Sequence, residues 1–77
     1  MELSECHKGR LCTIKSITVE DKIMRRLEAL GFVKGTPVRV LNRKRYGAVI
    51  IKIRGTRIAL GKAIAGGIEV EEVPDER

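Results

Sequence analysis

Three side chains near the start of the sequence are of types that bind metal ions: Cys6, His7 and Cys12. Thiolate and imidazole groups are usual zinc ligands, but a closed structural site needs four of them. No second pair of ligands follows, and His7 would point away from Cys6 if this segment is extended. We therefore expect no metal site, His7 on the surface, Cys12 buried as a small apolar residue, and both cysteines as thiols in a reducing compartment.

No set of residues suitable for catalysis is recognisable. The sequence has one histidine, so no imidazole other than that of His7 could activate a nucleophile. The glycine-rich segment 61–67 lacks the Gly-Lys-Ser/Thr ending with which a P-loop binds phosphate and magnesium. A chain of 77 residues also has little room for the enclosed pocket that a cofactor requires. We expect no catalytic site and no cofactor, and a binding protein instead of an enzyme.

Positive charge is the third chemical feature, and it is unevenly distributed along the chain. Residues 8–62 carry 15 Lys and Arg against 3 Asp and Glu, a net charge of +12, whereas the remaining residues have a net charge of −6. A basic body with an acidic tail suits an anionic partner. Solvation of a small surface explains the same charges equally well, so both interpretations stay open at this point.

One helix is predicted over Thr18–Leu30. Thr18 and Asp21 form a capping-box pattern at its start. Gly31 stands where a left-handed residue ends a helix, and Phe32 would close the end by packing back on the last turn. One apolar stripe runs along this helix at spacings of four, four and three: Val19, Ile23, Leu27 and Leu30.

The rest of the chain alternates apolar and polar residues with a period of two, which predicts strands. We expect a first strand at 9–17, then a three-strand meander with a basic loop at 42–47 and a hairpin turn at Gly55-Thr56, a helical or 3₁₀ turn at 61–67, and a last strand at 68–73. Five short strands and few aromatic residues suit a small closed barrel.

The same alternation predicts an outward face on the meander. It mixes apolar and basic side chains: Arg39, Leu41, Ile50, Lys52, Arg54, Arg57 and Ala59. Apolar residues rimmed by arginine are typical of protein interfaces, whereas single exposed apolar residues are ordinary. We favour a protein-binding surface because several apolar residues would lie together on one sheet.

The chain is expected to form a single domain over residues 1–77, with loose termini at 1–8 and 74–77. Its start lacks the basic and apolar regions of a signal peptide. The longest apolar run, Ala48–Ile51, is far too short for a membrane helix. These features predict a cytoplasmic protein without membrane insertion.

From about Leu11 to Val73 the chain resembles the FeoA family. The resemblance rests on an ordered set of residues at these spacings: Leu30-Gly31-Phe32, Gly35, Val38, Val40, Gly47, Arg57-Ile58-Ala59-Leu60-Gly61, Ile68 and Val70. It implies a mostly β fold, an SH3-like barrel with one inserted helix, and a cytoplasmic partner of FeoB, a membrane ferrous-iron transporter whose cytoplasmic part binds guanine nucleotide.

Two alternatives to this interpretation stay open. The same fold occurs as the C-terminal domain of iron- and manganese-dependent repressors, although no helix-turn-helix precedes it in this sequence. A nucleic-acid-binding barrel could use Arg43-Lys44-Arg45-Tyr46, with Tyr46 stacked on a base. A single aromatic residue offers little surface on which bases could stack, and the acidic tail would repel phosphate, so we favour the protein partner. The sequence leaves a homo-oligomer open.

Overall fold

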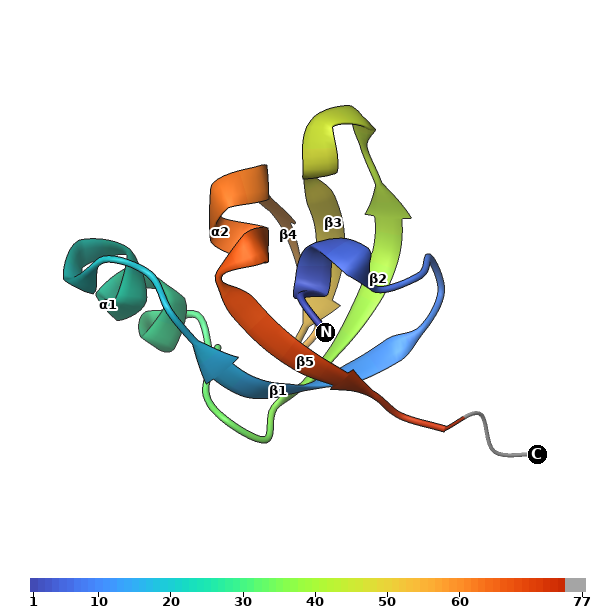
Figure 1. Cartoon of the computed structure of the whole chain (residues 1–77). Helices are drawn as coiled ribbons and strands as arrows, with labels where there is room; N and C mark the ends of the chain where they lie inside the picture. Colours follow the sequence, from blue (N-terminus) through green and yellow to red (C-terminus); the bar gives the residue numbers. More distant parts are fainter. Residues whose placement is uncertain (75–77) are drawn as a thin grey trace.

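A computed structural model describes residues 1–74 of the chain (Figure 1). Five strands form one antiparallel sheet in the order β4-β3-β2-β1-β5. The strands are β1 (Leu11–Ile17), β2 (Pro37–Arg43), β3 (Val49–Ile53), β4 (Thr56–Leu60) and β5 (Ile68–Glu72). The helical elements are η1 (Leu3–Glu5), α1 (Asp21–Ala29), η2 (Arg45–Gly47) and α2 (Lys62–Gly66).

The sheet curves around one aliphatic core, as the period-two pattern predicts (Figure 1). Alternate residues of the strands are fully buried, among them Val38, Val40, Ile51 and Ile68. The largest fully buried side chain is Phe32, in the loop after α1. The short helix α2 joins the two edge strands, β4 and β5. This architecture confirms the predicted mostly β fold of five strands with an inserted helix.

Helix α1 is shorter than predicted at both ends. Its N-cap is Glu20, and the Thr18 N–H instead donates to the carbonyl of Gly67 at 2.7 Å, so the capping-box prediction was wrong. Leu30 is the C-cap and is 46% exposed, so it does not continue the buried stripe. Within α1, the buried Leu27 belongs to the core and the half-buried Ile23 packs against it.

The end of α1 agrees with the prediction. Gly31 has a φ of +99°, a conformation that costs an L side chain energy. Its N–H donates to the Glu28 carbonyl at 3.0 Å, and the Phe32 N–H donates to the Leu27 carbonyl at 2.9 Å. These two bonds form a Schellman motif, which turns the chain so that Phe32 enters the core.

The N-terminal segment is packed against the sheet, which corrects the expectation that residues 1–8 are loose. The terminal amine of Met1 donates to Glu69 Oε2 at 2.7 Å, and the Val70 N–H donates to the Met1 carbonyl at 2.7 Å. Leu3 and Cys6 are fully buried. At the other end Pro74 is exposed, and the rest of the expected loose segment lies outside the described residues. None of the described helices is long and apolar enough to cross a membrane.

Candidate protein-binding surface

Strands β2, β3 and β4 bring three basic side chains into one line across the sheet. Arg39 pairs with Lys52, and Lys52 pairs with Arg57, all three being exposed. Side chains of directly paired residues lie on the same face, so we call Arg39, Lys52 and Arg57 the basic row. Like charges placed directly opposite one another destabilise a sheet. The fold therefore carries this row at a cost that packing does not explain.

An apolar row lies next to the basic row on the same face. Ile50 pairs with Ala59 on β4 and with Asn42 on β2. The β2–β3 register shifts between Val40 and Asn42, so Leu41 is an extra residue beside Ile50. Leu41 and Ile50 are half-buried and Ala59 is exposed. The structure thus brings together six of the seven residues predicted for the surface, and we call Leu41, Ile50 and Ala59 the apolar row.

Arg54 does not belong to this face. It forms the β3–β4 turn together with Gly55, with φ values of +51° and +81°, so the predicted turn at Gly55-Thr56 was displaced by one residue. Two successive positive φ values are typical of a type I′ hairpin turn. The Arg54 side chain lies over Gly31, where an added Cβ would stand 2.5 Å from Arg54 Cδ. This guanidinium therefore belongs to the end of α1 instead of the basic row.

The basic row is largely free of internal partners. Arg39 donates to the Gly9 carbonyl at 2.8 Å, which leaves its positive charge uncompensated. The ion pairs found among residues 1–74 do not include Arg39, Lys52 or Arg57. A face with uncompensated cations beside half-buried and exposed apolar side chains suits an acidic protein surface better than a small molecule.

The loop between β2 and β3 carries the second group of basic residues. Strand β2 extends through Arg43, so the loop is shorter than the predicted segment 42–47. Tyr46 is 87% exposed and has a φ of +68°. The Lys62 side chain, at the start of α2, lies over Gly47, where an added Cβ would stand 2.7 Å from Lys62 Cγ.

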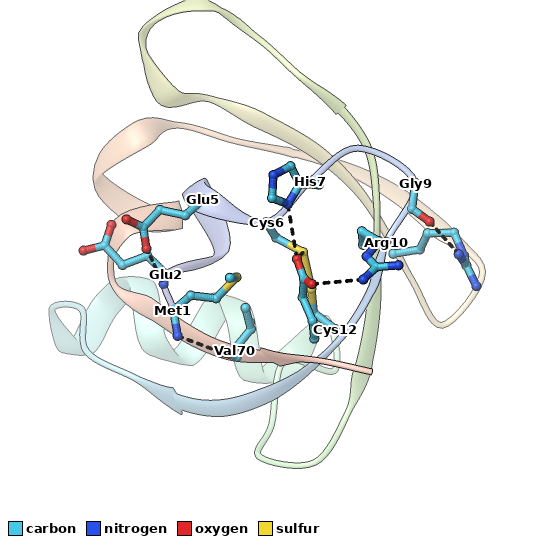
Figure 2. The surroundings of a disulfide bond; sticks show 11 residues. Met1, Glu2, Glu5, Cys6, His7, Gly9, Arg10, Cys12 and Val70 are labelled. Carbon is cyan, nitrogen blue, oxygen red and sulfur yellow. Dashed lines mark hydrogen bonds and ion pairs between the residues drawn. A yellow bond between two sulfur atoms is a disulfide. The ribbon is translucent and has the colours of Figure 1, made fainter. Parts of the chain in front are cut away.

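The cysteines expected to be thiols are joined to each other. A disulfide links Cys6 to Cys12 (Figure 2), and it corrects the expectation that both are free. Both residues are fully buried, which confirms Cys12 as part of the core. The disulfide fastens the N-terminal segment to β1. Two sulfur atoms bonded to each other are also not available as metal ligands.

The carboxylate of Glu72 on β5 holds the same region together. Its oxygens lie 3.4 Å from His7 Nδ1 and 3.4 Å from Arg10 Nη2, and Oε2 is 3.9 Å from Cys6 Sγ. In Figure 2, the dashed lines from His7 and from Arg10 meet at this carboxylate, which is drawn next to the disulfide. The hydrogen bond with His7, and then the charge of Arg10, lower the pKa of Glu72 although partial burial opposes this. His7 is exposed, as expected. Within residues 1–74, no three His, Cys, Asp or Glu side chains are grouped to hold a metal ion.

Solved structures similar to this chain include FeoA proteins and metal-dependent transcriptional repressors. The family model described as "FeoA domain" matches residues 1–72. No curated protein matches the sequence. The FeoA protein of Chlorobium tepidum is 28% identical with a TM-score of 0.88, and the match covers all of this chain and 74% of that one.

Two further structures are similar. The FeoA protein of Stenotrophomonas maltophilia complexed with zinc, described as a prokaryotic SH3 domain protein, is 33% identical with a TM-score of 0.79. That match covers 92% of this chain and 89% of the other. A manganese-dependent transcriptional repressor in complex with manganese is 25% identical with a TM-score of 0.85; the match covers 95% of this chain but 36% of the repressor.

Proposed function

The chain belongs to the FeoA family, and on that premise we propose that it is a cytoplasmic accessory protein of ferrous iron uptake. In this proposal it binds the cytoplasmic, guanine-nucleotide-binding part of a FeoB-like transporter and modulates that transporter. The role is one of binding, without a catalytic step of its own. Family membership supports the association with ferrous iron transport.

The observation that carries the partner-binding part is the pairing of the basic row with the apolar row on one face. Protein interfaces draw most of their energy from a few apolar or arginine anchors that lose their water, and the surrounding residues mainly exclude solvent. Ile50 lies in the middle strand of this face, between Asn42 and Ala59. It is therefore the expected anchor, with Lys52 and Arg57 giving complementarity to acidic side chains of the partner.

The test is the affinity of the purified chain for the cytoplasmic domain of the FeoB-like transporter of the same cell. Ile50→Asp should weaken binding at least tenfold at low and at high salt, because truncating an anchor costs about 2 kcal/mol or more. Val33→Asp is the matched control, because Val33 is 48% exposed in the loop after α1 and belongs to neither row. Equal affinities of the two folded variants would show that the proposed face is wrong.

Nucleic acid is the alternative partner, favoured by the exposed Tyr46 among Arg43, Lys44 and Arg45. Binding through phosphates would weaken steeply with salt, in proportion to the phosphates contacted. Replacing the three cations of the loop with Ser should mainly slow association with a protein partner. If the wild type instead binds RNA or DNA tightly, with a salt dependence that this variant loses, the transporter partner should be abandoned.

A further inference from the structure

The β2–β3 loop holds its one aromatic side chain away from the protein. Tyr46 is 87% exposed, and its backbone is in the left-handed region with a φ of +68°. Residues other than glycine seldom adopt this conformation, and Tyr gains none of the local hydrogen bonding that lets Asn or Asp tolerate it. The left-handed backbone at Tyr46 therefore lowers stability, and the largely exposed phenol ring does not offset this loss by packing. Residues of this kind cluster at binding sites.

Four cations lie on the loop that carries Tyr46 or directly beside it. Arg43 ends β2, Lys44 and Arg45 follow it in the loop, and all three are exposed. Lys62 of α2 reaches the loop because its aliphatic stem lies over Gly47. We call these five residues the basic tip: Arg43, Lys44, Arg45, Tyr46 and Lys62. The ion pairs found within residues 1–74 include none of these four cations. Their charge is therefore available to an external anion.

The shape of the basic tip decides which anion it suits. The loop is the connection of a strand pair and stands at one end of the molecule, with α2 beside it (Figure 1). Single-stranded nucleic acid is usually bound in a groove where several aromatic residues stack on successive bases. The depressions described on this protein, of about 390 and 190 Å³, are lined by residues of the β5 edge and of the α1 region and not by the basic tip.

A lipid bilayer places different demands on a protein. Its surface is broad, so a projecting tip reaches it without a groove. An anionic leaflet attracts each Lys or Arg close to it with about 1 kcal/mol. Tyrosine is enriched at the depth of the lipid headgroups, because its ring is apolar and its hydroxyl is polar. The basic tip has both features, an exposed tyrosine and four cations on or beside its loop.

We propose that the basic tip docks on the surface of an anionic membrane. Arg43, Lys44, Arg45 and Lys62 bind the headgroup phosphates, and the ring of Tyr46 enters the interface between them. This contact is peripheral and needs no membrane-spanning segment. It uses different residues from the basic and apolar rows, so variants of one set test it separately from the proposed transporter contact.

The chain offers an internal probe for this contact. Tyr46 is its one tyrosine and the chain has no tryptophan, so tyrosine emission reports on the basic tip alone. We expect sedimentation with phosphatidylglycerol-containing vesicles but not with pure phosphatidylcholine vesicles, and quenching of Tyr46 emission by brominated lipid. Both effects should weaken as salt is raised. Because the vesicles contain no protein, the result is independent of the proposed transporter partner.

Two variants and one matched control distinguish vesicle binding through the basic tip from attraction by the net charge of the whole protein. Lys44→Ser with Arg45→Ser should lower vesicle affinity at least about tenfold, since each cation near the surface contributes about 1 kcal/mol. Arg25→Ser with Arg26→Ser removes the same charge from exposed positions of α1 and should keep the affinity within about twofold. Tyr46→Asn should weaken vesicle binding without lowering the melting temperature, because Asn tolerates a positive φ.

Three outcomes would overturn the proposal. Equal losses of vesicle affinity in the loop and α1 variants would mean that binding depends only on the net charge of the protein. Sedimentation without quenching of Tyr46 would place the contact elsewhere on the molecule. Absence of vesicle binding together with tight binding of a single-stranded RNA oligonucleotide, lost in the loop variant, would assign the basic tip to nucleic acid.

Discussion

Strand β5 carries Glu69, Glu71 and Glu72, and each of these carboxylates has a cationic partner in the same molecule. Glu69 binds the terminal amine at 2.7 Å, Glu71 lies 3.9 Å from Lys15, and Glu72 lies between Arg10 and His7. Strands β2, β3 and β4 carry the basic row, where Arg39, Lys52 and Arg57 face one another across the sheet. The acidic strand thus holds the N-terminal segment in place, whereas the basic face repels itself.

This difference separates charges that serve the fold from charges that serve a partner. Exposed ion pairs contribute little each, about 0–1 kcal/mol. The acidic strand therefore needs the buried Leu3 and the disulfide to hold the N-terminal segment. The basic face makes one such contact, the hydrogen bond from Arg39 to the Gly9 carbonyl, and the ion pairs found among residues 1–74 include none of its three cations. If this difference is real, substitutions in the segment that the acidic strand holds should lower stability and leave partner binding unchanged. Substitutions in the basic row should weaken partner binding without lowering stability.

The largest effect should come from Leu3→Ala. Leu3 is fully buried in the segment that the acidic strand holds, so truncation should lower the free energy of unfolding by about 2 kcal/mol or more. Leu30→Ala is the matched control, because Leu30 is 46% exposed and its truncation should cost about 0.5 kcal/mol or less. Urea denaturation of both variants measures the difference. Equal and small costs would mean that the N-terminal segment is not part of the core.

The disulfide should give the next largest effect. Closing a short loop between Cys6 and Cys12 stabilises a protein by about 2 kcal/mol in the chain-entropy model. A reductant should therefore lower the melting temperature of the wild type and leave that of a Cys6→Ser, Cys12→Ser double variant unchanged. Two free thiols, titrated in oxidised wild-type protein under denaturing conditions, would contradict the disulfide. Transporter binding should be unaffected, since neither cysteine belongs to the basic or apolar row.

Lys52→Glu should have a smaller effect and the opposite sign on stability. It places a carboxylate between Arg39 and Arg57, so it should raise the free energy of unfolding by about 0.5 kcal/mol while it weakens binding to the transporter domain. Lys15→Glu is the mirror control, because it sets a carboxylate against Glu71 and should lower stability by a similar amount. A loss of stability in Lys52→Glu would show that the basic row supports the fold.

Local patterns predicted the parts of this fold that local contacts determine. The left-handed Gly31 and the alternation of Val38, Val40 and Ile51 follow from short-range sterics and from period-two burial. Six of the seven surface residues then followed from the same alternation. Arg54 did not, because Arg-Gly lacks the turn signal of Asn-Gly and the shift of one residue moves a side chain off the face.

The N-terminal segment could not be predicted in this way. Its one buried leucine, Leu3, stands among polar residues. The hydrogen-bond partners of the Met1 amine, Glu69 and Val70, come more than sixty residues later. A single apolar residue followed by a cysteine was the one signal available, and it is too common to distinguish a packed segment from a loose one.

The smallest effect should be the dependence of stability on pH through Glu72. The hydrogen bond with His7 and the charge of Arg10 lower the pKa of this carboxyl below its usual value near 4.5. A carboxyl whose pKa is lower in the folded state stabilises the fold at pH above its unfolded pKa, and it loses that contribution as the pH falls through the folded value.

The wild type should therefore be more stable than Glu72→Gln at neutral pH, and this difference should shrink as the pH falls below 4.5. Thermal melts of both proteins over a pH series measure it. In a His7→Ala background the Glu72→Gln difference at neutral pH should be smaller, since the largest cause of the lowered pKa is gone. A difference that grows on acidification would mean that Glu72 is held in the folded protein as the neutral acid, and the acidic strand would then not act through its charge.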